Sequence, residues 1–257
     1  MTWLRVLIAV PYGLIVGSFV TVLVHRVPAG QSVVAPRSKC PSCGAQIAAR
    51  DNVPVLSWLM LRGRCRSCGV RIPARYPAIE LATAALFAIA ALRYTDVWLL
   101  VLSSTFLALL LALSLIDVAH KILPNRLVYP ALIVFPAFLV LARIAGAPVG
   151  LVDAAIGFLA YGGAMLVVAL ISPKGMGMGD VKLASLVGLV VGAVDLPSVA
   201  VAAGLAILLG GAGAVAALAM GKGRKSAVPF GPFLAAGAAL ALLVGPAIAD
   251  AYVRSMT

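Results

Sequence analysis

Four cysteines are the first residues of this chain whose type and spacing indicate a chemical site. They form two C-x-x-C pairs separated by 21 residues, and a glycine directly follows each pair. Tight turns at these glycines would let all four thiolates point at one ion, and four thiolates complete the tetrahedral shell of Zn²⁺. Such a closed shell leaves no open position for a reaction, so we expect a structural zinc ion. Two disulfides or four free thiols remain alternatives. The predicted ligands are Cys40, Cys43, Cys65 and Cys68.

Two aspartates stand where apolar runs meet polar segments. Asp117 ends an uncharged run of 19 residues, and Asp180 follows Gly177-Met178-Gly179 at the start of a short apolar run. Carboxylates at membrane depth are costly and are functional candidates by default. Two of them facing each other across a wet cleft would share a proton and could activate water against a peptide carbonyl. Two interfacial helix caps are the alternative interpretation.

The other acidic residues are expected to have local roles. Asp51 lies among the cysteines and is predicted to cap a turn or helix. Glu80 lies near the start of an apolar run, where it favours the helix dipole or faces a polar cavity. His120, three residues after Asp117, is expected to be a solvated loop residue. Four aspartates fall at predicted outer helix ends or turns: Asp96, Asp153, Asp195 and Asp250.

The composition indicates which elements must position these residues. The chain has 257 residues, of which 63% are hydrophobic and 11% are charged. A soluble domain would carry about 25% charged residues, so a soluble enzyme, a disordered tail and a secreted disulfide scaffold are disfavoured. We expect an all-α polytopic membrane protein. The net charge of +12 favours basic loops facing an anionic inner leaflet over nucleic-acid binding.

Eight apolar runs are predicted to be membrane helices, since about 20 apolar residues cross the hydrocarbon core. The sixth run is short, so it should begin near Asp180 or lie partly buried in protein. Two glycine pairs, Gly13/Gly17 and Gly188/Gly192, have the spacing of close helix packing. The runs are Val6–Val24, Tyr76–Leu92, Trp98–Ile116, Leu127–Ala142, Ala154–Ile171, Leu183–Val194, Ser198–Gly221 and Ser226–Ala249.

The basic residues predict the orientation. Alternating the gaps between eight helices places 16 of the 20 Lys and Arg residues on one face, which should be cytoplasmic. Both termini should then lie outside, and both Asp117 and Asp180 should lie at the cytoplasmic boundary. The cysteines would face a reducing compartment, which disfavours disulfides. The opposite face carries Arg5, Arg93, Arg143 and Arg254.

One connection is long, and it sets the domain boundaries. We expect a first membrane helix over residues 1–25, a cytoplasmic zinc-binding loop over 26–75 and a multi-helix membrane domain over 76–257. The loop is too small to fold by burial alone, so the metal would fold it.

Short motifs follow one another in a specific order along most of the chain. They are Gly17-Ser18-Phe19, His25-Arg26-Val27-Pro28, Pro36–Pro41, Asp51–Trp58, Arg62–Cys65, Arg75-Tyr76-Pro77 with Glu80-Leu81, Asp117 with Leu123-Pro124, Gly177–Leu183 and Pro229–Phe233. In this order, and with the two cysteine pairs, the sequence resembles the bacterial type IV prepilin leader peptidases, the bifunctional prepilin peptidase/N-methyltransferases.

The resemblance implies an intramembrane-type aspartic endopeptidase of the bacterial inner membrane, with Asp117 and Asp180 as its catalytic pair. Its substrates would be prepilins or type II secretion pseudopilins, cut after the glycine that ends a short basic leader, at the cytoplasmic face. The resemblance also implies methylation of the new N-terminal amine by S-adenosylmethionine. This second activity is tied to residues 26–75, because shorter relatives without that loop are peptidases only. Candidates for methyl transfer are Gly63 and Arg64; candidates for substrate positioning are Gly177, Gly179, Lys182 and Glu80.

Three residues depart from the family's pattern. Thr21 stands where Asn is common, Ala119 where a second acidic residue often follows, and Asn125 where Asp usually follows Leu-Pro. These departures leave the aspartate pair intact and bear on substrate positioning or pH dependence. Two other classes remain open: an ion- or proton-coupled transporter with a zinc-stabilised loop, and a scaffold that binds a partner through the zinc module. Membrane lipids are expected partners, and nucleic acid is not.

Overall fold

The computed structural model describes residues 2–173, 176–221 and 229–256. The chain divides into two compact units. The first unit holds the chain up to Thr95 together with Leu107–Ala112, and the second holds Asp96–Phe106 and the chain from Leu113 onward. All the regular elements of the described residues are helices, as the composition predicts.

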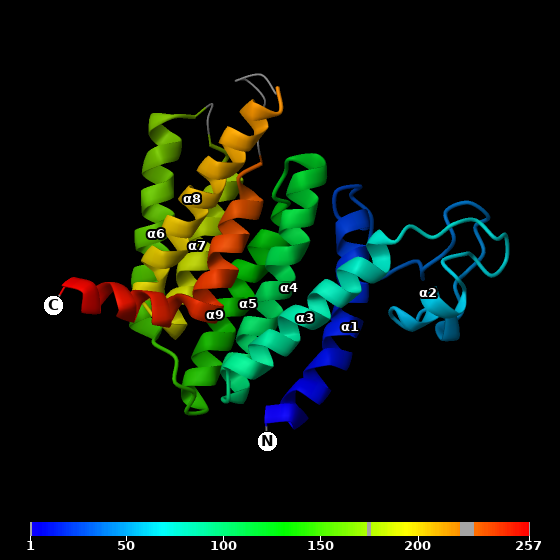
Figure 1. Ribbon diagram of the computed structural model, residues 1–257, viewed down its shortest axis with the longest axis horizontal. Coiled ribbons are helices and arrows are strands. Elements are labelled where there is room, and N and C mark those ends of the chain that lie inside the picture. The colour runs from blue at the N-terminus through cyan, green and yellow to red at the C-terminus, as the bar shows by residue number, and fades with distance from the viewer. Residues whose placement is uncertain (1, 174–175, 222–228, 257) are drawn as a thin grey trace. The chain divides into compact units, whose positions relative to one another are not determined.

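The first unit is built on two packed helices, α1 (Thr2–Arg26) and α3 (Arg75–Arg93), which lie side by side in Figure 1. Glycines set their close approach: a Cβ on Gly13 would lie 2.6 Å from Ala84 Cα, and one on Gly17 would lie 2.7 Å from Glu80 Cα. This confirms the packing predicted for the first glycine pair. The helices are antiparallel, because later residues of α1 meet earlier residues of α3.

The segment between these helices forms a small irregular module around the cysteines. It contains a 3-10 turn, η1 (Ala49–Asp51), and one short helix, α2 (Leu56–Met60). Two isolated antiparallel bridges, Lys39 with Gln46 and Arg64 with Arg71, close the two cysteine turns. Among residues 28–74 only Cys40, Ser57 and Gly63 are buried. So little burial cannot hold a fold of this size, which agrees with the expected need for a metal.

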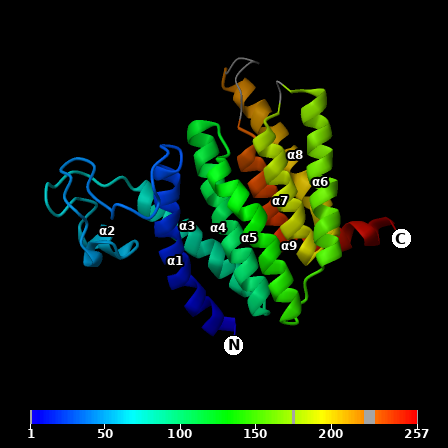
Figure 2. The ribbon, with the colours of Figure 1, turned by 180° about the vertical axis from the view of Figure 1, so that it is seen from behind.

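The second unit is a helical bundle. Helices α6 and α7 pack against each other, as do α8 and α9 (Figure 2). Gly188 of α7 packs backbone to backbone against Gly157 of α6, and a Cβ on Gly192 would lie 2.7 Å from Asp153 O, which confirms the second glycine pair. The bundle's helices are α4 (Val97–His120), of which Leu107–Ala112 belong to the first unit, and α5 (Asn125–Ile144), α6 (Leu151–Ile171), α7 (Met178–Val194), α8 (Pro197–Ala219) and α9 (Gly231–Met256).

The predicted spans agree with the helices. Seven helices of the described chain are long and apolar enough to cross a membrane: α1, α3, α4, α5, α6, α8 and α9. The eighth predicted span is α7, whose 17 residues measure about 26 Å, less than the roughly 30 Å of a hydrocarbon core. It begins just before Asp180, and most of its residues are buried. Both features match the expectation for the short run.

The helix ends differ from expectation in two places. The predicted start of the last span, Ser226–Val228, lies outside the described residues together with Lys174, Lys222, Arg224 and Lys225; the helix itself begins at Gly231. Asp250 was expected at a helix end, but α9 continues past it to Met256. Asp96 does cap α4, accepting from the amides of Trp98 and Leu99, and Asp195 accepts from the amide of Ser198.

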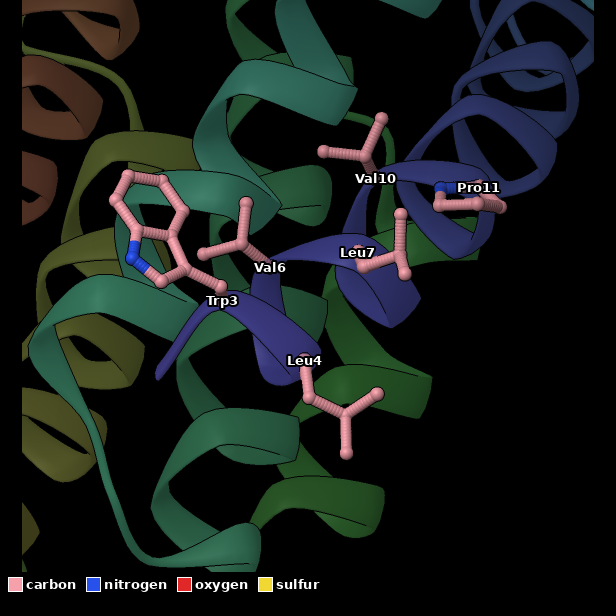
Figure 3. A pocket seen from close by; sticks show the side chains of 6 residues that line it. All are labelled: Trp3, Leu4, Val6, Leu7, Val10 and Pro11. Atoms are coloured by element: carbon pink, nitrogen blue, oxygen red, sulfur yellow. The ribbon is translucent and has the colours of Figure 1, made fainter. Parts of the chain in front are cut away.

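An apolar hollow of about 630 Å³ lies beside the first turns of α1 (Figure 3). Its lining carries no acid, base or nucleophile, so it offers no chemistry. Six side chains line it, all from α1: Trp3, Leu4, Val6, Leu7, Val10 and Pro11.

Candidate active site and metal centre

Asp117 lies in the last turn of α4, on the buried side of the helix. It is 5% exposed and follows the fully buried Ile116, whereas the next three residues are exposed. The helix ends three residues later, where Lys121 takes a left-handed conformation and donates its amide to Asp117 O at 2.8 Å. His120 is exposed, as expected of a solvated residue. The turn therefore directs one carboxylate into the bundle.

Asp180 is the third residue of α7 and is half-buried. Its Oδ2 accepts from the amide of Gly177 at 3.3 Å, which caps the first turn of the helix. Gly179, next to Asp180, packs against Leu123, which lies six residues after Asp117. The structure thus brings two carboxylates, 63 residues apart in the sequence, to the same end of the bundle.

A third element reaches the same place at the start of α9. The amide of Gly231 donates to Asp117 Oδ2 at 3.0 Å. A Cβ on Gly231 would lie 2.6 Å from that same oxygen, so a glycine is needed there. Pro229–Phe233 was singled out as a motif, but sequence reasoning assigned Gly231 no role, because the donor is a backbone amide and side-chain types do not reveal it.

Leu123 joins the three elements. A Cβ on Gly179 would lie 3.0 Å from Leu123 Cβ, and one on Gly231 would lie 3.3 Å from Leu123 Cδ2. The Leu-Pro segment after α4 therefore packs between the glycines that precede Asp180 and the glycine that holds Asp117. Gly179 serves this close packing, whereas Gly177 is exposed and has space around it.

Lys182 is held beside this site by polar contacts. Its Nζ donates to Asn125 Oδ1 and to Tyr129 Oη, each at 3.0 Å, and lies 4.6 Å from the centroid of the Tyr129 ring. Two of the three departures from the family pattern thus have partners: Asn125 accepts from Lys182, and buried Thr21 donates to Ser18 O at 2.7 Å. Ala119 is exposed.

The four cysteines gather as their spacing predicts. Their sulfur atoms all lie within 4.8 Å of one another, and Cys40 Sγ is 3.9 Å from Cys68 Sγ. Four Zn–S bonds of about 2.3 Å in a tetrahedron would place the sulfurs about 3.8 Å apart, so the cluster fits one ion of this size. All four are free thiols rather than disulfides. Amides of Cys43 and Ser42 lower the pKa of Cys40 to about 6, whereas desolvation and the neighbouring thiols raise the pKa of Cys68 to about 11, so one thiol of the cluster ionises far more readily than another.

The two cysteine turns share one geometry. The amide of Gly44 donates to Cys40 O, and the amide of Gly69 donates to Cys65 O, each at 2.9 Å. Both glycines have positive φ, 72° and 70°, which lets each turn close. Asp51 was expected to cap a turn; instead its carboxylate binds Arg66 of the second turn through both oxygens, at 2.6 and 2.8 Å. This hydrogen-bonded partner lowers the pKa of Asp51.

Gly63 has a packing role. Its φ is +65°, and a Cβ would lie 2.8 Å from Cζ2 of Trp58, whose indole nitrogen donates to Ile72 O at 3.0 Å. The indole therefore lies directly on the Gly63 backbone. Arg64, the other candidate for methyl transfer, is exposed.

We expect Gly63→Ala to destabilise the cysteine module by about 1–3 kcal/mol, because it combines a left-handed alanine with a collision against Trp58. Proteolytic cleavage of residues 28–74 in the intact protein measures this. Gly30→Ala is the matched control, since Gly30 has φ +69° but no neighbour within 4 Å. Equal effects of the two changes would contradict the packing role.

The sequence of the chain is similar to those of known proteins. Residues 12–94 match the bacterial peptidase A24 N-terminal domain, and residues 104–215 match the type IV leader peptidase family. A protein of Bacillus subtilis (strain 168) named prepilin leader peptidase/N-methyltransferase is 37% identical, with 95% of this chain and 96% of the relative covered. The chain belongs to the type IV leader peptidase family.

Other members of this family are similarly close. Relatives with the same name occur in Dichelobacter nodosus, 36% identical over 94% of this chain and 92% of the relative, and in Stutzerimonas stutzeri, 34% identical over 97% and 94%. No solved structure matches the chain. The two matched regions separate the cysteine module and its flanking helices from the part of the bundle that holds both aspartates.

Proposed function

We propose that this chain removes the basic leader from type IV prepilins or type II secretion pseudopilins and then methylates the new N-terminal amine. Membership of the family and the printed name shared by its relatives support both activities. The single observation that supports an aspartic mechanism is the convergence of Asp117, Asp180 and the Gly231 amide at one end of the bundle.

The pair can hydrolyse a peptide bond without a further group. With one proton shared between Asp117 and Asp180, the ionised carboxylate takes a proton from water, and the water oxygen attacks the carbonyl carbon. The protonated partner gives its proton to the carbonyl oxygen. As the tetrahedral intermediate collapses and its C–N bond breaks, the leaving amine takes a proton from one carboxyl group and a hydroxyl of the intermediate gives its proton to the other, so the pair again holds one proton. Gly231 and Gly177 each bind an Oδ2 atom, and no hydrogen bond within the described residues reaches either Oδ1 atom, so we assign the Oδ1 atoms to water and substrate.

The membrane position suits such a substrate. The excess of basic residues on one face supports a cytoplasmic position for the two aspartates of this multi-pass inner-membrane protein. The hydrophobic helix of a prepilin can then stay in lipid while the bond after its leader's glycine is cut. Both the leader and this protein are basic, so they repel each other overall. We infer that Asp117 and Asp180 attract the leader locally. No observation favours a transporter, whose coupling sites usually lie near mid-membrane in broken helices.

A synthetic prepilin-like peptide tests this function. The peptide carries a basic leader, a glycine and an apolar segment that begins with Phe, and mass spectrometry follows its products. We expect loss of the leader in the absence of a methyl donor, and a further gain of one methyl group when S-adenosylmethionine is added. An intact peptide, or a cut that requires the donor, would overturn the proposal.

We propose that the four cysteines of the module bind a structural zinc ion. The sulfur positions fit a tetrahedral ion, and the module has almost no buried side chains to fold it. When bound, zinc would supply only a fixed geometry, because four thiolates leave no open position. The residues of the module, rather than the metal, would then contribute to methyl transfer.

Purified protein should contain about one zinc ion per chain, measured by mass spectrometry of the metal. We expect chelation, or the change Cys65→Ser, to make the module sensitive to protease and to stop methyl transfer, while leader cleavage stays within about threefold of the untreated enzyme. Full methyl transfer at zero zinc would remove this assignment.

The hollow in the cysteine module does not suit the charges of the methyl donor. A hollow of about 270 Å³ lies beside Arg26 and Arg37, and no carboxylate lines it. S-adenosylmethionine carries a sulfonium and an ammonium cation beside one carboxylate, so two guanidinium groups could bind its carboxylate but would repel both of its cations. Segment 2–95 has two acidic residues, and both already accept hydrogen bonds. Asp51 accepts from Arg66, and Glu80 accepts from the amide of Val55. We therefore derive no step through the donor from these residues.

A further inference from the structure

Glu80 is a buried carboxylate that the proposed hydrolysis does not use. It is 8% exposed, in the first turns of α3, where its backbone packs against Gly17 of α1. In the described part of the chain it forms no ion pair. A buried carboxylate without a cation is costly unless hydrogen bonds satisfy it, so its partners show what it is for.

Those partners come from two different segments. Oε2 of Glu80 accepts from the amide of Val55 at 2.7 Å, and Ser18 of α1 interacts favourably with the same carboxylate. A hydrogen bond to an ionised acceptor is roughly twice as strong as a neutral one. Glu80 thus connects the helix pair to the cysteine module through a backbone amide. This engagement differs from the substrate-positioning role considered for Glu80.

The backbone at Val55 is strained, and it introduces the only α-helix of the module. Val55 has φ 59° and ψ −52°, a conformation that is rare for a β-branched residue. Helix α2 begins at the next residue. Such a conformation persists only where surrounding contacts impose it. The bond from Glu80 supplies one such contact at the strained residue itself.

Helix α2 carries this restraint to the metal cluster. Trp58 of α2 packs on Gly63, and its indole donates to Ile72 O, on either side of the second cysteine pair. Ser57 of α2 binds the segment that precedes the helix: its hydroxyl donates to Arg50 O at 3.0 Å and accepts from the amide of Val53. A continuous set of contacts therefore runs from Glu80 through Val55 and α2 to the turn that holds Cys65 and Cys68.

We propose that Glu80 is a positioning residue that fixes the cysteine module on the α1–α3 pair, and that methyl transfer depends on it whereas leader hydrolysis does not. This rests on the proposed assignment of methyl transfer to the module. Glu80 acts through Val55 and needs no contact with substrate.

Two substitutions at Glu80 separate positioning from simple packing. Glu80→Leu keeps the volume but removes the acceptor, and we expect methyl transfer to fall at least about tenfold while leader cleavage stays within about threefold. The Val55 amide should exchange with deuterium faster. Glu80→Gln keeps an acceptor oxygen and should restore most of the methyl transfer. Thr83→Val is the matched control, since Thr83 is buried one turn away and its hydroxyl bonds only to Ile79 O of its own helix.

The outcomes are distinct. Wild-type methyl transfer in Glu80→Leu, or unchanged exchange at Val55, would overturn the proposal. Equal loss of cleavage and methylation in a protein with normal zinc content and melting temperature would also overturn it, since Glu80 would then serve the aspartate pair. If Glu80→Leu does not fold, Glu80→Met, which also removes the acceptor but has a more adaptable side chain, gives the same comparison. A wild-type protein that never methylates would instead refute the proposed second activity, and exchange at Val55 would still decide the role of Glu80.

Discussion

Replacing either aspartate of the pair by asparagine should reduce leader cleavage by at least about 10³-fold, because each change removes one of the two groups that move protons. Asparagine keeps the side-chain size and can still accept from Gly231 or Gly177, so Asp117→Asn and Asp180→Asn should insert and fold. The rate of leader loss from a prepilin-like peptide measures the effect. Methylation of a peptide supplied without its leader should persist in both variants.

Asp96→Asn is the matched control for these changes. Asp96 caps α4, and asparagine caps helices about as well as aspartate. We expect its cleavage rate within about twofold of the unchanged enzyme. Cleavage that persists in Asp117→Asn or in Asp180→Asn at a comparable rate would refute the aspartic mechanism.

The change Gly231→Ala should cost at least about 100-fold in leader cleavage. The new methyl group would lie 2.6 Å from Asp117 Oδ2, so either the carboxylate or the start of α9 must move. Displacement of a catalytic group by about 1 Å is enough for a loss of this size. The turnover rate at saturating peptide should carry most of the loss, because the change affects the reacting groups rather than the binding of the leader.

Gly163→Ala provides the control, since nothing lies within 4 Å of a Cβ at this position in α6. Its activity should be unchanged, and its stability equal or higher, because alanine favours a helix by up to about 1 kcal/mol over glycine. Melting temperatures of both variants separate misfolding from misplacement. A fully active, folded Gly231→Ala enzyme would show that this amide has no part in the site.

Local patterns explain what the sequence could predict. The cysteine cluster follows from two short turns of fixed spacing, and the helices follow from uninterrupted apolar runs. The depth of Asp117 and Asp180 at the ends of such runs identified both as a candidate pair. Even the short α7 was expected to begin near Asp180 and to lie buried.

Contacts between distant segments explain what the sequence could not predict. Gly231 meets Asp117 across 114 residues through a backbone amide, and residue types carry no trace of that bond. Glu80 was considered as a group facing a cavity, because its partner, the amide of Val55, exists only once the module has folded. The pairing of Asp51 with Arg66 likewise depends on how the two cysteine turns meet.

The antiparallel seam of α1 and α3 has an evolutionary consequence. Gly17 faces Glu80 and Gly13 faces Ala84, so the end of α1 at Arg26 and the beginning of α3 at Arg75 are held near each other. Deleting the intervening stretch would leave a gap that a tight hairpin could bridge without disturbing the seam. The contacts that join α1 to α3 therefore do not require the module, and a chain that lacks it could keep this pair of helices.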